Sequence, residues 1–282
     1  MNRKDLIVEG IRLSYLEHVP VNDPAGHPIV FFIHGNSGSA DGWIHQLSDP
    51  ALQSYRLIAF DLPAHGDSDV LAGSALTYSF PDLGRLIAGA VRQLAGVQPY
   101  VLAGLSIGTN IVVESLPDLK PAGIVLIGSC IMGAKLSMEK AFFPGIDLAP
   151  GFTDAVTEPS LNDYCTLAAR WTSPQDLDTY KRSFRMVKDG FRSKMFAALS
   201  EGRLSDETAL LEASGVPVLV LFGREERVCK TDALDGLTFH FWGDQVYKID
   251  GAGHLAQSDQ PEACNSLLMA FAAGVMTLPG TK

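Results

Sequence analysis

The chain has 282 residues, a formal net charge of -10, 46% hydrophobic residues and 19% charged residues. This length and composition indicate a soluble globular protein built around one large domain, and they exclude a disordered chain. The acidic balance argues against nucleic acids and anionic membrane surfaces as partners.

Short apolar runs alternate with helical patterns along the first half of the chain. The strands expected at 6–9 and 11–16 form a small hairpin around Gly10. Four buried strands are expected at 28–33, 57–60, 100–103 and 124–127. Continuous apolar runs of this kind are typical of strands that are covered on both faces. Apolar residues at helical spacing predict helices over 42–47, 82–94 and 110–116.

The pattern changes between residues 131 and 213. This part contains no buried-strand run, and glycines and prolines interrupt its helix-like pieces. Its many aromatic residues either pack those helices together or line a cleft. Strands at 216–222 and 246–249 and a helix over 260–273 then resume the earlier alternation.

These elements predict an α/β fold, with a mostly parallel sheet flanked by helices. We expect residues 1–130 and 214–282 to form the core in two parts, and residues 131–213 to form an inserted helical cap. In such sheets, ligands bind beyond the carboxyl ends of the strands. The loops that are rich in polar and titratable residues each follow a predicted strand: 34–39, 61–68, 104–108, 223–228 and 251–254.

The segment Gly104-Leu105-Ser106-Ile107-Gly108 fits the G-x-S-x-G nucleophile elbow between a strand and a helix. The turn is tight, so its outer positions need glycine, and the serine is held in a strained conformation. A serine hydroxyl needs a base within hydrogen-bond reach to act as a nucleophile at neutral pH. The pattern alone is common, so Ser106 needs partners elsewhere in the chain.

His254 is the candidate base, because it follows the last predicted strand in a glycine-rich loop and fits the order serine, acid, histidine. His65 is more consistent with holding its loop. The orienting carboxylate is expected after the strand at 216–222, where Glu226 is the first candidate. Glu225 is the second, and Asp232 and Asp235 are the third.

An anionic tetrahedral intermediate needs two hydrogen-bond donors at its oxyanion. The N–H of Ile107, at the start of the predicted helix, supplies one. The turn His34-Gly35-Asn36 is expected to supply the other through the N–H of Asn36, which leaves the Asn36 side chain free to contact substrate.

The order HGNSGS, DLPAHGDS, GLSIG, GREE and GAGH resembles the α/β-hydrolase superfamily over nearly the whole chain. Within it, the chain is most similar to the serine-dependent N-acyl-homoserine lactonases. This resemblance implies Ser106 as nucleophile, His254 as base, Glu226 as acid, and Asn36 and Tyr164 as substrate contacts. The chain departs from the pattern at Ala64, where glycine is usual, and at Ile107.

We therefore expect acyl transfer on a small-molecule ester or lactone, without a cofactor. We expect no metal, since a metal-dependent lactonase would need clustered histidines such as H-x-H. A carboxylesterase, a cofactor-free perhydrolase, a carbon–carbon bond hydrolase and a receptor-like binding protein stay open as alternatives. The cysteines are far apart and lack C-x-x-C spacing, which predicts reduced, buried thiols in a cytoplasmic protein. We expect a monomer or a homodimer. No apolar run reaches the length of a membrane span, and the N-terminal residues lack a signal-type apolar core.

Overall fold

In the computed structural model, which describes residues 1–20 and 26–276, eight strands form one sheet in the order β1-β2-β4-β3-β5-β6-β7-β8. The strands are β1 (Asn2–Val8), β2 (Ile11–His18), β3 (Ile29–Ile33), β4 (Arg56–Phe60), β5 (Tyr100–Leu105), β6 (Gly123–Ile127), β7 (Val218–Gly223) and β8 (Phe241–Ile249). β2 pairs antiparallel with β1 and β4. Along the rest of the sheet, β4-β3-β5-β6-β7-β8, each pair of neighbouring strands is parallel. The predicted α/β sheet is confirmed.

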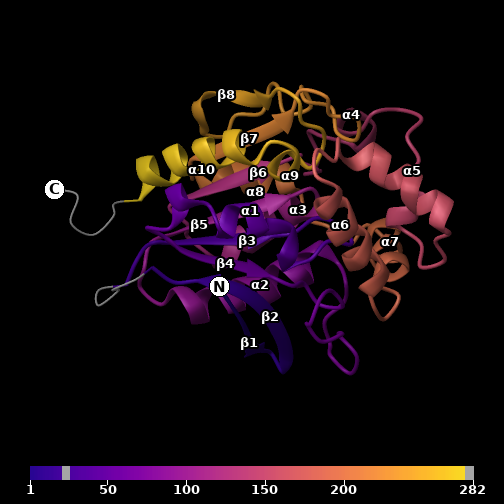
Figure 1. Cartoon of the computed structure of the whole chain (residues 1–282), viewed down its shortest axis with the longest axis horizontal. Coiled ribbons are helices and arrows are strands. Elements are labelled where there is room, and N and C mark those ends of the chain that lie inside the picture. The colour runs from indigo at the N-terminus through magenta and orange to yellow at the C-terminus, as the bar shows by residue number, and fades with distance from the viewer. Residues whose placement is uncertain (21–25, 277–282) are drawn as a thin grey trace.

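Helices cover both faces of this sheet (Figure 1). They are α1 (Ile44–Leu47), α2 (Phe80–Ala95), α3 (Ile107–Ser115), α4 (Met138–Ala141), α5 (Glu158–Ala168), α6 (Pro174–Met186), α7 (Phe191–Ser200), α8 (Glu207–Ser214), α9 (Ala256–Asp259) and α10 (Pro261–Val275). Short 3-10 turns are η1 (Ala40–Trp43), η2 (Pro50–Leu52), η3 (Leu116–Asp118) and η4 (Ala149–Gly151).

The strand β3 shows how the sequence divides the core into two layers. Ile29, Phe31 and Ile33 point into the cluster that also contains residues of α2 and α3. Val30 and Phe32 point into the cluster on the other face, which contains residues of α1 and α10. Each buried large apolar side chain contributes about 1.5–3 kcal/mol to folding, so this doubly covered strand anchors the sheet.

Between β6 and β7 the described chain forms α4 to α8. Figure 1 shows α4, α5, α6 and α7 grouped at the right of the sheet, whereas α8 lies among the helices of the sheet layer, where it packs against α3. A small separate apolar cluster of Leu161, Cys165 and Phe184 holds α5 and α6 together. This helical segment therefore has a core of its own at one end of the sheet.

The predicted strands and helices are present, but several ends differ. β8 begins at Phe241 rather than at residue 246, because it is an edge strand whose exposed side chains give no continuous apolar run. α3 begins directly after Ser106 rather than at residue 110, because the elbow turns straight into the helix. Ala64 has a φ of 67°, in the left-handed region, which explains why glycine is usual there. Within the described residues, none of the helices has both the length and the apolar character that crossing a membrane requires.

Candidate active site

Ser106 lies in the sharp turn between β5 and α3, with φ 53° and ψ -123°. Its N–H donates to the carbonyl of Ile127 at 2.9 Å, which holds this strained backbone in place. A Cβ added at Gly104 would lie 2.4 Å from the carbonyl oxygen of Gly108, and one added at Gly108 would lie 2.4 Å from that of Ile33. Both outer positions of the turn therefore require glycine.

His254 follows β8 and is buried against Glu226, which follows β7. Nδ1 of His254 is 2.9 Å from Oε2 of Glu226, and the two side chains are 5% and 0% exposed. The other carboxylate oxygen accepts the backbone N–H groups of Arg227, Val228 and Cys229 at 2.9, 2.8 and 3.3 Å. Burial opposes the charge of Glu226, but His254 and the backbone N–H groups hold the pKa of Glu226 below its usual value.

The other candidate acids lie elsewhere. Glu225 forms an ion pair with Arg170 at 2.5 Å on the surface, where its side chain is 41% exposed. Asp232 and Asp235 are exposed. Among the four candidates from the sequence, Glu226 is therefore the one in contact with His254.

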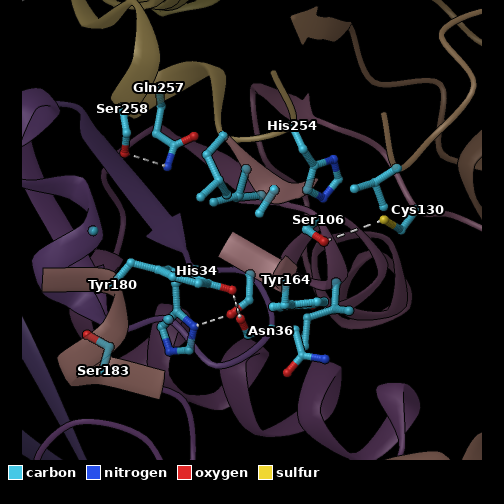
Figure 2. A pocket seen from close by; sticks show the side chains of 18 of the residues that line it. His34, Asn36, Ser106, Cys130, Tyr164, Tyr180, Ser183, His254, Gln257 and Ser258 are labelled. Atoms are coloured by element: carbon cyan, nitrogen blue, oxygen red, sulfur yellow. Dashed lines mark hydrogen bonds between the residues drawn. The ribbon is translucent and has the colours of Figure 1, made fainter. Parts of the chain in front are cut away.

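Figure 2 shows the imidazole of His254 directed toward the hydroxyl of Ser106, with the sulfur of Cys130 beside both. Cys130 Sγ lies 3.5 Å from Ser106 Oγ and 3.2 Å from the sulfur of Cys229. A hydrogen bond from Cys229 and the adjacent His254 lower the pKa of Cys130 to about 6, and burial raises the pKa of Cys229. Burial alone would lower the pKa of His254, but the carboxylate of Glu226 and the side chain of Cys130 raise it.

The sequence analysis did not predict that Cys130 and Cys229 lie beside Ser106 and His254. Cys130 follows the buried strand β6, so the rule that strand ends gather at one edge of the sheet could have found it. Cys229 comes three residues after Glu226 and reaches the site because β6 and β7 are neighbours. The backbone at Gly128 passes very close to His254, because an added Cβ would lie 2.8 Å from Nδ1 of His254.

The loop after β3 lies directly against the elbow, since a Cβ added at Gly35 would be 3.1 Å from the Cβ of Ser106. The expectation that the Asn36 side chain is free is wrong. Its Nδ2 donates to the carbonyl of Gly151 at 2.7 Å, and its Oδ1 accepts the Ser37 hydroxyl at 2.8 Å. Arg192 of α7 in turn donates from Nε to the Ser37 hydroxyl at 2.8 Å. The side chain of Asn36 thus ties the loop to the helical segment.

A cavity opens above Ser106, and Asn36 and Tyr164 line it. Many lining residues from the helical segment are apolar: Met132, Met138, Phe142, Leu148, Phe152, Leu167 and Leu199. Polar lining residues come from η1, α1, α6 and α9: Asp41, His45, Asp176, Thr179, Ser183, Gln257 and Ser258. In Figure 2, Ser183, Gln257 and Ser258 lie at the left, across the cavity from Cys130. The cavity lining therefore combines apolar side chains from the helical segment with polar groups on η1, α1, α6 and α9.

Two tyrosines border this cavity between the elbow and the helical segment. Tyr180 donates from its hydroxyl to the carbonyl of Asn36 at 3.3 Å, and burial raises the pKa of Tyr164. Among the other histidines, His65 is buried beside His34 and Phe191, with Nδ1 at 3.0 Å from the carbonyl of Pro63, where it holds its loop.

Residues 30–267 match the sequence model of the Alpha/beta hydrolase family. The chain belongs to this family. One relative is the dihydrolipoyllysine-residue acetyltransferase component of the acetoin cleaving system of Cupriavidus necator, 28% identical over 95% of this chain and 68% of that protein. Another is the 2-hydroxy-6-oxononadienedioate/2-hydroxy-6-oxononatrienedioate hydrolase of Klebsiella pneumoniae, 25% identical over 90% of this chain and 91% of that protein.

Among solved structures, the chain is similar to a mutant of the N-acyl homoserine lactonase AidH in complex with N-hexanoyl homoserine lactone. The two superpose with a TM-score of 0.85 at 23% identity, over 99% of this chain and 100% of that chain. At this level of identity the similarity establishes the α/β-hydrolase fold, and the helical segment is included in it.

Proposed function

We propose that this protein hydrolyses carboxylic esters or lactones through an acyl-enzyme on Ser106. The observation that carries the proposal is the buried His254–Glu226 pair, joined at 2.9 Å, beside a serine in a strained strand-to-helix turn. A carboxylate on Nδ1 fixes the tautomer in which Nε2 is an acceptor, which is the form that a general base needs.

In this mechanism, Nε2 of His254 takes the proton of the Ser106 hydroxyl as the oxygen attacks the carbonyl carbon. The N–H groups of Ile107 and Asn36 stabilise the resulting oxyanion, each by ~3 kcal/mol. Ile107 is the first residue of α3, so its N–H is among those that a helix leaves without an intrahelical acceptor. His254 then returns the proton to the leaving alkoxide, and water repeats the sequence to release the acid.

The substrate that fits best is a lactone or ester with an apolar acyl chain. The apolar side chains of the lining would hold the acyl chain, and its polar groups would hold the head group. The similarity of fold to AidH supports an N-acyl homoserine lactone as the substrate, with Tyr164 and the Asn36 loop as its contacts. Residues 131–213 would then act as the cap that selects the substrate.

A carbon–carbon bond hydrolase is the second candidate, because the Klebsiella pneumoniae relative, which matches over 90% of this chain, is named as a 2-hydroxy-6-oxononadienedioate/2-hydroxy-6-oxononatrienedioate hydrolase. A panel of acyl homoserine lactones from butanoyl to dodecanoyl, p-nitrophenyl esters and vinylogous diketo acids separates the two. We expect proton release with the lactones and esters, and turnover of diketo acids alone would favour the second candidate.

The test of the nucleophile is Ser106→Ala, with Ser129→Ala as the matched control. Ser129 follows the neighbouring strand, and its buried hydroxyl has no hydrogen-bond partner among the described residues. Ser106→Ala should lower kcat by a factor on the order of 10^6 and abolish labelling by a fluorophosphonate, whereas Ser129→Ala should keep both. A wild-type protein that turns over no substrate and resists the fluorophosphonate would instead be a binding protein on this fold.

A further inference from the structure

Three ligand-type side chains that are far apart in sequence meet beside Ser106. One sulfur each from Cys130 and Cys229 and one ring nitrogen of His254 lie within 4.8 Å of one another. The two sulfurs are 3.2 Å apart, both cysteines are free, and all three residues are buried. The proposed hydrolysis uses His254 alone of the three, so the paired thiols have no part in it.

Two thiolates and one imidazole form the donor set of Cys2His zinc sites, in which a fourth position stays open. Zinc is bound at about 2.3 Å from sulfur and about 2.0–2.1 Å from nitrogen, so ligand atoms within 4.8 Å of one another can surround one ion after small shifts. The open position would face Ser106, whose hydroxyl is 3.5 Å from the sulfur of Cys130.

The Glu226–His254 contact supports the same conclusion. A histidine that binds a metal ion through one nitrogen usually donates its other N–H to a carboxylate, which fixes the ring and makes it a better ligand. Nδ1 of His254 already makes this contact with Glu226, and Nε2 is the nitrogen left for an ion. The carboxylate also adds negative charge close to a cation.

The site can be reached from the cavity. Cys130, His254 and Ser106 line it, and Cys229 lies directly behind Cys130. A hydrated cation that enters toward Ser106 thus meets Cys130 and His254 first and then Cys229. The apolar wall beside it, which includes Val228 and Met132, favours a soft cation bound by sulfur over a hard cation bound by oxygen.

We propose that Cys130, Cys229 and His254 form an inhibitory site for a thiophilic divalent cation of the zinc type. Binding forms two metal–sulfur bonds and one metal–nitrogen bond, and it releases to solvent the protons that the thiols and His254 carry. Because the ion occupies Nε2 of His254, the base can no longer accept the proton of Ser106. The inhibition rests on the proposed hydrolase function, whereas the binding does not.

The binding test uses the reduced full-length protein and Cd2+, whose thiolate complexes have an ultraviolet charge-transfer band. We expect one Cd2+ per chain, displaced by Zn2+, and the same stoichiometry in Ser106→Ala. Cys130→Ala and Cys229→Ala should each weaken binding by more than the roughly 10- to 100-fold that loss of an outer partner costs. Cys165→Ala and Cys264→Ala, which remove the other two buried thiols, should retain the band.

A second measurement keeps the test valid if a cysteine variant does not fold. In the wild-type protein, Zn2+ should protect Cys130 from alkylation, as located by mass spectrometry, and should inhibit ester hydrolysis in proportion to occupancy until EDTA removes it. The absence of a Cd2+ band in the wild type, or a band that survives removal of both Cys130 and Cys229, would overturn the site. Stoichiometric binding with full remaining activity would overturn its inhibitory role.

Discussion

Glu226→Gln changes one oxygen of the site to an amide nitrogen and tests how the carboxylate acts on His254. In the wild type, one oxygen of Glu226 accepts three backbone N–H groups, and the other accepts Nδ1–H of His254. A glutamine has a single oxygen and must choose between the two sides. If its NH2 group faced the backbone, two buried donors and one partly buried donor would lose their acceptor.

The choice follows from the energies. An unsatisfied buried donor costs about 1–3 kcal/mol, so the two buried donors, with the partly buried third, outweigh the one hydrogen bond to His254. The glutamine oxygen therefore stays on the backbone side and its NH2 group faces Nδ1. Nδ1 must then accept, the proton moves to Nε2, and Nε2 can no longer take the Ser106 proton. A wrong tautomer of this kind lowers kcat by ~10^4, or about 5 kcal/mol.

The assay is kcat on a p-nitrophenyl ester, with circular dichroism and thermal unfolding to verify the fold. Glu225→Gln is the matched control, because Glu225 pairs with Arg170 at the surface and should change kcat by less than about twofold. A Glu226→Gln enzyme within tenfold of wild type, or a larger loss in Glu225→Gln, would refute the assignment of Glu226 as the orienting acid.

The remaining predictions concern the support of the site. Glu207 is fully buried and accepts from Met132 N and Asn110 Nδ2, and burial raises the pKa of Glu207 well above its ordinary 4.5. The unfolded chain therefore loses this proton first. Between pH 4.5 and the higher pKa of the folded state, Glu207 lowers the stability by about 1.4 kcal/mol per pH unit, and Glu207→Gln should remove this contribution to the fall of Tm with pH. A wild-type Tm that shows the same pH dependence as the variant would contradict this. Gly128→Ala should lower kcat/KM on the order of a hundredfold, because its Cβ would lie 2.8 Å from Nδ1 of His254. Gly96 has a similar φ of 56° but open space around it, so Gly96→Ala should lose about 1–2 kcal/mol of stability and keep its activity. If Gly96→Ala and Gly128→Ala lost the same activity, displacement of His254 would be excluded as the cause.

The sequence predicts which loops meet, because parallel strands carry their carboxyl ends to one edge of the sheet. The positions of Ser106, His254 and the Asn36 loop follow from that rule. Glu226 could be ranked above Glu225 by its spacing from the end of β7, and the structure shows that only Glu226 reaches His254. The catalytic roles of these residues remain predictions.

Features set by packing between distant elements could not be predicted in this way. The meeting of Cys130 with Cys229 depends on β6 and β7 being neighbours, since 99 positions separate the two in the chain. The engagement of Asn36 with Gly151 depends on how the helical segment folds back over the sheet. In β8 the exposed residues Gly243, Asp244 and Gln245 separate the half-buried Phe241 and Trp242 from the rest of the strand, so its start at Phe241 could not be read from a continuous apolar run.

In the proposed mechanism, the hydrogen bond between Asn36 and Gly151 links substrate selectivity to the rate of catalysis. The loop expected to stabilise the oxyanion is held by the helical segment at Gly151 and, through Ser37, at Arg192. A bulky ligand that pushes this segment outward would pull on the same backbone, whose N–H must be held about 2.7–3.1 Å from the reacting oxygen. Engineering for larger substrates should therefore enlarge the cavity by replacing apolar lining residues with smaller ones. Weakening the contacts between the helical segment and the Asn36 loop would instead slow the reaction, even for ligands that already fit.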